Sequence, residues 1–185
     1  MTSLTRPHTG PTTLWRPLAL TLAGAALITL GAKLQIPFWP VPMTLHTLAV
    51  MLIAAALGPR LGMAAMATYL AAGAMGLPVF SGSPARGVGL AYMAGPTGGY
   101  LLGYLVAAGL TGWLALGRGW IGRGLAMLAG LATVYAAGLL WLSAFIPASG
   151  LVAAGLAPFI AGDLLKIALA TLLLSGWARL RGRGA

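Results

Sequence analysis

Long apolar stretches alternate with short polar connections along most of the chain. A helix that spans a bilayer needs about 20 largely apolar residues. The pattern predicts six such helices, over residues 17–34, 44–57, 61–77, 97–116, 121–143 and 156–177. We therefore expect an all-α membrane protein with a polar tail over 1–16, a six-helix transmembrane domain over 17–178 and a basic tail over 179–185.

Two of these predicted spans differ from an ordinary transmembrane helix. The second is short, and Gly58-Pro59-Arg60 after it is typical of a tight turn, which would make spans two and three a hairpin. The first could be a signal peptide, because Arg6 and Arg16 precede an apolar run. The apolar core of a signal peptide is only about 7–15 residues long. This run continues to Leu34, so we expect a span that is retained.

Composition supports a lipid environment. Hydrophobic residues make up 59% of the chain and charged residues 6%, whereas a soluble domain has about 25% charged residues. The net charge of +10 comes from basic residues scattered between apolar runs, which argues against a nucleic-acid-binding surface. The chain has no cysteine, so disulfides, zinc thiolate sites and thiol redox chemistry are excluded.

The basic residues also predict an orientation. Lys33 and Arg86 lie on one side of the predicted spans. Eight arginines lie on the other side, which by the positive-inside rule is the cytoplasm. Both termini are then cytoplasmic, and the connections after spans one, three and five face outward. The eight are Arg6, Arg16, Arg60, Arg118, Arg123, Arg179, Arg181 and Arg183.

Two of the outward connections are unusually apolar. Residues 35–42 hold three prolines together with Phe38 and Trp39, and residues 78–96 are rich in Gly, Ser and Pro but also contain Tyr92. Irregular apolar backbone near a membrane is tolerated where protein buries it or where it lines a cavity. We therefore expect a covered pocket that opens to the outside, with these aromatic side chains as candidate walls.

Asp163 and Lys166 are the most informative polar residues. They are three positions apart on the sixth predicted span, so they share a helical face. At 1.5 Å per residue, Lys166 lies on the order of 15 Å into this helix. Ionisable groups at that depth are costly and usually functional. The pair could contact a polar ligand, or it could be an ion pair that only neutralises itself.

Three further residues are candidate ligand contacts. Arg86 lies in the second outward connection, where its planar guanidinium could bind a carboxylate or a lipid headgroup. His46 lies beside Thr44 near the outer end of span two, and could contact a ligand or be a packed core residue. Lys33 is expected to extend to the membrane interface. With one carboxylate, two histidines and no cysteine, we expect no metal site.

Several enzyme classes are excluded by missing motifs. Neither lysine follows the glycine of GxxxxGK[ST], so the chain has no Walker A sequence and cannot hydrolyse ATP alone. No GxSxG sequence occurs, and a single carboxylate cannot supply paired acid–base catalysis. We expect no catalytic residue and no cofactor.

Several ordered motifs together resemble the BioY family, the biotin-specific S-components of energy-coupling-factor (ECF) transporters. The motifs are Gln35 to Thr47, Leu57-Gly58-Pro59-Arg60-Leu61-Gly62, Gly76 to Gly82, Gly95-Pro96-Thr97-Gly98-Gly99-Tyr100-Leu101, and Pro158 to Lys166. The resemblance implies a six-helix S-component bundle in a bacterial cytoplasmic membrane. It also implies an outward-facing biotin site, a transmembrane coupling protein and a pair of ATP-binding-cassette (ABC) ATPases as partners.

The resemblance assigns roles to single residues. Asp163 and Lys166 match the family's Gly-Asp-x-x-Lys element, which contacts the ligand. Ala19 and Ala23 match the small-xxx-small pattern of the first helix, which meets the coupling protein. The sequence departs from the family at His46, where Gln is frequent, and at residues 83–87, where a glycine run is frequent.

These observations lead to one hypothesis and three alternatives. Asp163 would accept a ureido N–H of biotin, Lys166 and Arg86 would be alternative partners of the carboxylate or the ureido oxygen, and Phe38, Trp39 and Tyr92 would hold the ring system. One alternative is an S-component for another vitamin or a small carboxylate. The second is an intramembrane hydrolase that uses His46 with Ser81 or Ser83, and the third is a structural subunit that binds no small molecule.

Overall fold

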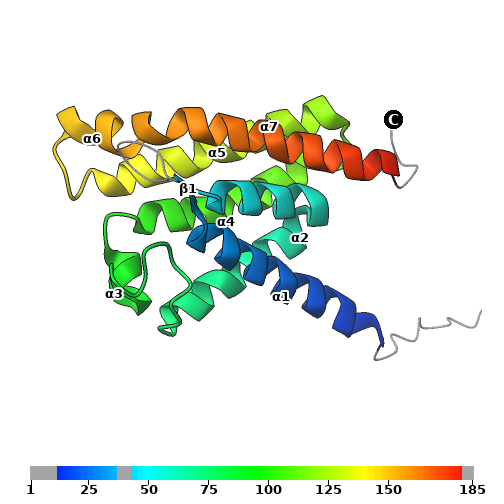
Figure 1. Ribbon diagram of the computed structural model, residues 1–185, viewed down its shortest axis with the longest axis horizontal. Coiled ribbons are helices and arrows are strands. Elements are labelled where there is room, and N and C mark those ends of the chain that lie inside the picture. Colours follow the sequence, from blue (N-terminus) through cyan, green and yellow to red (C-terminus); the bar gives the residue numbers. More distant parts are fainter. Residues whose placement is uncertain (1–11, 37–42, 181–185) are drawn as a thin grey trace, which may run out of the picture.

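The computed structural model is built almost entirely of helices and describes residues 12–36 and 43–180 (Figure 1). Two residue pairs, Gln35 with Thr44 and Ile36 with Met43, form a minimal antiparallel ladder. The all-α fold class is confirmed. In chain order the elements are α1 (Thr12–Lys33), β1 (Gln35–Ile36), β2 (Met43–Thr44), α2 (His46–Ala74), α3 (Gly89–Ala94), α4 (Gly98–Ala115), α5 (Trp120–Leu142), α6 (Ala148–Gly155) and α7 (Ala157–Leu180).

Helix α2 contains two of the predicted spans. At Gly58 the backbone leaves the helical region, with φ of +80°, and Pro59 follows. A positive φ is readily adopted only by glycine. Figure 1 shows the chain doubling back at this point. The two halves pack together, because a Cβ added to Gly62 would lie 3.0 Å from Ala54 Cα. The predicted hairpin is confirmed.

By length and composition, five continuous stretches of the described residues could cross a membrane, and the folded-back α2 is one of them. The boundaries differ from the prediction at both ends of the chain. Helix α1 starts at Thr12, inside the stretch expected to be a polar tail, and contains Pro17. The last span is preceded by the separate short helix α6, which the sequence pattern did not predict. Phe38 and Trp39 lie outside the described residues.

The helices are arranged around α4, which packs mainly against α5 and α2. Helix α7 packs on α2 and α5, while α1 packs mainly on α2. Figure 1 shows the ladder, α3 and α6 towards one end of the bundle, and the start of α1 and the C-terminal end of α7 at the other. The connections after spans one, three and five therefore share one end, which we call the loop end.

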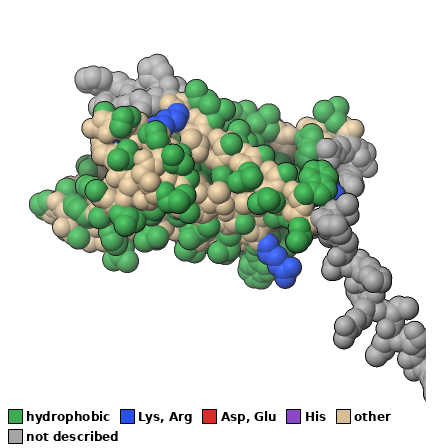
Figure 2. Space-filling view, turned by 90° about the horizontal axis from the view of Figure 1, so that it is seen from below, with side chains coloured by type: hydrophobic (Ala, Val, Ile, Leu, Met, Phe, Trp, Pro, Cys, Tyr) green, Lys and Arg blue, Asp and Glu red, His purple; other side chains and the backbone are tan. Residues whose placement is uncertain are grey.

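The outer surface of the bundle is apolar. Hydrophobic side chains cover much of the face shown in Figure 2, where Lys and Arg appear only at isolated points. Large side chains such as Leu140 and Leu165 are 78% and 70% exposed. Such a surface is unfavourable in water and suits contact with lipid chains, so it agrees with a helical bundle within a bilayer.

The turn at Gly58 packs directly against α4. A Cβ added to Gly112 would lie 2.6 Å from Pro59 N and 2.7 Å from the Gly58 carbonyl carbon, so backbone meets backbone here. Small residues allow helices in membranes to approach this closely.

We predict that Gly112→Ala lowers stability by about 1–3 kcal/mol through overpacking. Gly176→Ala on α7 is the control, because a Cβ there meets no atom within 4 Å. Thermal unfolding in detergent checks this prediction. Equal unfolding temperatures for the two variants would contradict the close approach at Gly112.

Candidate ligand-binding site

A cavity of about 290 Å³ lies inside the loop end of the bundle. Its walls come from β2 and from every helix from α2 to α7, together with the connections between α2 and α3 and between α3 and α4. The volume is near the lower end of the range for small-molecule sites, about 300–1,000 Å³. The chain has five tyrosines, and all of them line this cavity: Tyr69, Tyr92, Tyr100, Tyr104 and Tyr135.

One wall of the cavity contains a buried charged cluster. Lys166 Nζ donates to Asp163 Oδ1 at 2.8 Å, and Tyr135 O–H donates to Asp163 Oδ2 at 2.7 Å. Asp163 and Lys166 are 5% and 7% exposed. The two residues lie one turn apart on α7, as expected from their spacing, and Tyr135 approaches them from α5. Lys166 has three N–H donors and a carboxylate has about four acceptor positions, so both groups can also bind a ligand.

Aromatic rings form a second wall, and the fully buried Phe80 packs behind it. Phe80 stacks on Tyr92, with ring centroids 4.7 Å apart, and meets Tyr69 edge to face at 5.5 Å. His46 lies between Tyr69 and Tyr104, with centroid distances of 5.2 and 4.5 Å. These contacts make a continuous row of rings from α3 to α4. Aromatic surfaces of this kind suit a flat or bicyclic apolar ligand body.

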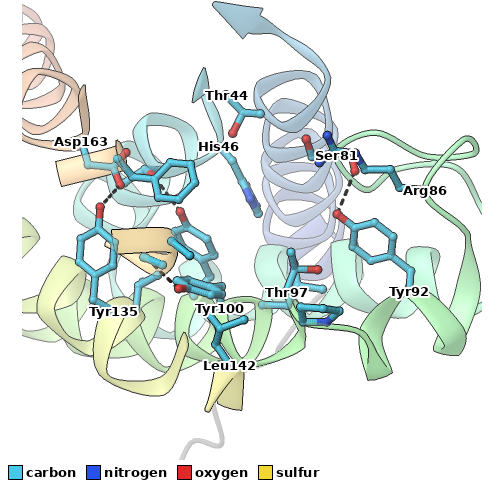
Figure 3. Close-up of a pocket in the computed structure, with 18 of the residues that line it drawn as sticks. Thr44, His46, Ser81, Arg86, Tyr92, Thr97, Tyr100, Tyr135, Leu142 and Asp163 are labelled. Carbon is cyan, nitrogen blue, oxygen red and sulfur yellow. Dashed lines mark hydrogen bonds between the residues drawn. The ribbon is translucent and has the colours of Figure 1, made fainter. Parts of the chain in front are cut away.

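The loop between α2 and α3 brings a second cation to the cavity. Arg86 and Ser81 lie together on this side, opposite Asp163 and Tyr135 (Figure 3). Tyr92 O–H donates to the Ser81 carbonyl at 2.9 Å and so ties the loop to α3. A ligand in the cavity therefore meets a Lys–Asp pair at one side and a guanidinium at the other.

Lys33 makes hydrogen bonds that the sequence did not predict. Its Nζ donates to Ser83 O at 2.7 Å and to Ser83 Oγ at 2.9 Å, so it ties the end of α1 to the same loop. The lysine is exposed at the end of α1, and the expectation that it extends to the membrane interface stays a prediction. Ser83 Oγ in turn donates to the Phe80 carbonyl. The Ser83 hydroxyl therefore bonds to a backbone carbonyl and not to a histidine, which does not suit a nucleophile of an intramembrane hydrolase.

Six predicted contacts come together at one cavity: Thr44, His46, Arg86, Tyr92, Asp163 and Lys166. Ala19 and Ala23 are exposed on α1, away from the cavity, where a partner helix could reach them. No cluster of three metal-ligating side chains occurs within the described residues.

Three further tyrosines line the cavity and were not predicted from the sequence: Tyr69, Tyr104 and Tyr135. A signal for them was available. Each lies in the middle of an apolar span, where a phenol needs a hydrogen-bond partner or a cavity.

A bundle of apolar helices around a cavity with a buried ion pair in its wall defines a membrane protein with a candidate small-solute site. The BioY family model matches residues 3–183, and the chain belongs to the BioY family.

Named relatives agree with the family match. The chain is 40% identical to the biotin transporter BioY of Thermotoga maritima over 150 residues, which is 80% of this chain and 87% of that protein. It is 36% identical to the probable biotin transporter BioY of Pyrococcus horikoshii over 158 residues, 85% of this chain and 93% of that one. A solved S-component for biotin from an ECF-type ABC transporter superposes with a TM-score of 0.78 at 30% identity and covers 96% of both chains.

The hydrogen bond from Tyr135 to Asp163 yields a prediction. Tyr135→Phe removes a bond to a buried charged group, which contributes about 1.5–3 kcal/mol, whereas a bond to a neutral acceptor contributes about 0.5–1.5 kcal/mol. Tyr100→Phe is the matched comparison, because Tyr100 O–H donates to the neutral Gly155 carbonyl. In thermal unfolding we expect the larger loss for Tyr135→Phe. The reverse order would contradict an ionised Asp163.

Proposed function

We propose that this chain is the substrate-capture subunit of a biotin uptake system and binds biotin in the cavity at its loop end. The observation that carries the proposal is that the buried Asp163–Lys166 ion pair and Arg86 line the same aromatic-lined cavity. Family membership and the biotin S-component as a structural neighbour support the same ligand.

The chemistry of biotin suits such a site. Its ureido ring has two N–H donors and one oxygen acceptor, its ring system is apolar, and its tail ends in a carboxylate. Asp163 accepts a ureido N–H in this proposal. Lys166 and Arg86 are the two available cations among the described cavity residues, and they take the ureido oxygen and the carboxylate between them. Thr44, Tyr92 and His46 complete the walls.

The proposed orientation places the loop end outside the cell and both termini in the cytoplasm. It is supported by the excess of arginines at the opposite connections. Energy for uptake then comes from partners: a transmembrane coupling protein and ABC ATPases. The small residues Ala19 and Ala23 on the exposed side of α1 are the proposed contact with the coupling protein.

Equilibrium binding of biotin to the purified chain in detergent tests this function. We expect stoichiometric binding by the wild type and at least a tenfold loss of affinity in Lys166→Ala and in Asp163→Asn, because each removes a charged hydrogen-bond partner worth about 1.5–3 kcal/mol. Folding of each variant is checked by thermal unfolding. A folded wild type that binds no biotin would refute the proposal. Competition with other vitamins distinguishes biotin from a different small carboxylate.

A separate prediction concerns Arg86. Arg86→Ala is expected to weaken biotin binding by about tenfold, because a charge-assisted bond to the ligand is lost. Arg118→Ala is the control, since Arg118 lies between α4 and α5 at the other end of the bundle. Binding measured by isothermal calorimetry decides the outcome. Equal affinities of the two variants would exclude Arg86 from the site.

A further inference from the structure

His46 occupies a central place in the cavity that its role as a wall does not explain. It is the first residue of α2 and is only 7% exposed. In Figure 3 its ring lies between two groups of residues, with Asp163 and Tyr135 on one side and Ser81, Arg86 and Tyr92 on the other. In this view the imidazole lies between the two charged sides of the site.

One polar atom of this ring is unpaired. His46 Nε2 is buried and has no hydrogen-bond partner within the described part of the chain. Buried polar atoms in native proteins are nearly always hydrogen bonded, so each exception requires a physical explanation. His46 lines the ligand cavity, so a ligand bound there is the natural source of the missing partner.

The ring is also held in place before any ligand binds. Tyr69 and Tyr104 flank it, and the hydroxyl of Tyr104 shares a 2.6 Å hydrogen bond with Thr47. The Tyr104 hydroxyl is thus already engaged with the residue that follows His46. A polar group fixed in this way loses little conformational entropy when it binds a ligand.

The charges around the cavity indicate which ligand group His46 binds. Among the described residues, the cations that line the cavity are Lys166 and Arg86. A ligand carboxylate binds best to such cations. The imidazole is then available to bind an uncharged polar group of the ligand. Its Nε2 is a hydrogen-bond donor or acceptor according to the tautomer of the ring.

We propose that His46 Nε2 forms a hydrogen bond with the uncharged polar group of the ligand and selects for ligands that carry one. This inference rests on the proposed function, in which the group is the ureido moiety of biotin. His46 is then a specificity-determining contact between the two charged sides of the site, in addition to its packing between two tyrosines.

His46→Phe is the decisive variant. It retains a ring between Tyr69 and Tyr104 but removes the unpaired nitrogen. Replacing an unsatisfied buried polar atom by an apolar group of similar shape is neutral or stabilising. We therefore expect the unfolding temperature without ligand to stay the same or to rise, while the Kd for biotin increases about tenfold, the loss of one hydrogen bond of about 1.4 kcal/mol. A residue that only packs would not give this combination.

Two further variants serve as controls. His46→Gln keeps a hydrogen-bonding group and is expected to bind biotin within about threefold of the wild type, a residual of under 1 kcal/mol. Thr111→Val changes another buried polar residue, one that donates to the Ala126 carbonyl outside the cavity, and should leave biotin affinity unchanged. If the phenylalanine is not accommodated and the variant does not fold, His46→Leu replaces it in the same comparison.

Biotin methyl ester separates the two ends of the ligand, because it keeps the ureido group and lacks the carboxylate. The His46→Phe loss is expected to be the same for the ester as for biotin. An unchanged biotin affinity in folded His46→Phe, or a loss that disappears with the ester, would overturn the assignment while the proposed function stands. A wild type that binds no biotin would overturn the proposed function and this assignment together.

Discussion

The ion pair between Asp163 and Lys166 inside an apolar bundle is the constraint on which the rest of the structure depends. Lipid cannot solvate these charges, so they must be paired, hydrogen bonded and turned inward. This requirement fixes the rotation of α7: Lys166 is buried while Leu165 beside it is 70% exposed. It also requires α5 to approach α7 closely enough for Tyr135 to donate to the carboxylate.

The remaining cavity walls meet a related requirement, which is to be apolar while leaving few polar atoms unpaired. Tyrosine does this well, because its ring packs against neighbours and its hydroxyl needs only one partner. Tyr92 and Tyr100 donate to the carbonyls of Ser81 and Gly155, and these bonds tie the loop and α6 to the site. The result is a cavity whose shape is largely set without ligand, and preorganisation of this kind favours affinity.

The sequence predicts the helical class, the hairpin at Gly58 and the meeting of Asp163 and Lys166, because each depends on a local pattern: apolar length, a Gly-Pro turn, and three-residue spacing. The place of Tyr135, Tyr104 and Tyr69 in the site could not be predicted in the same way. Their roles depend on which helices become neighbours, and small residues such as Gly112 set those distances through long-range packing.

Other differences arise from single tertiary contacts. The sequence pattern could not predict that Lys33 bonds to Ser83, because the two residues are fifty positions apart and meet only in the folded chain. The short α6 before the last span has no clear signal, since it is as apolar as the span that follows it. His46 shows a third case: its position near Thr44 was visible in the sequence, but its unpaired nitrogen is a property of the folded cavity alone.

The central claim is that the two charges of the buried pair are needed for ligand binding and add little net stability. The most direct test is the double variant Asp163→Asn with Lys166→Met, which removes both charges and keeps an acceptor for Tyr135. A neutral replacement of a buried ion pair is often as stable as the original. We expect unfolding at or above the wild-type temperature together with loss of biotin binding. A double variant that still binds biotin with wild-type affinity would contradict the account.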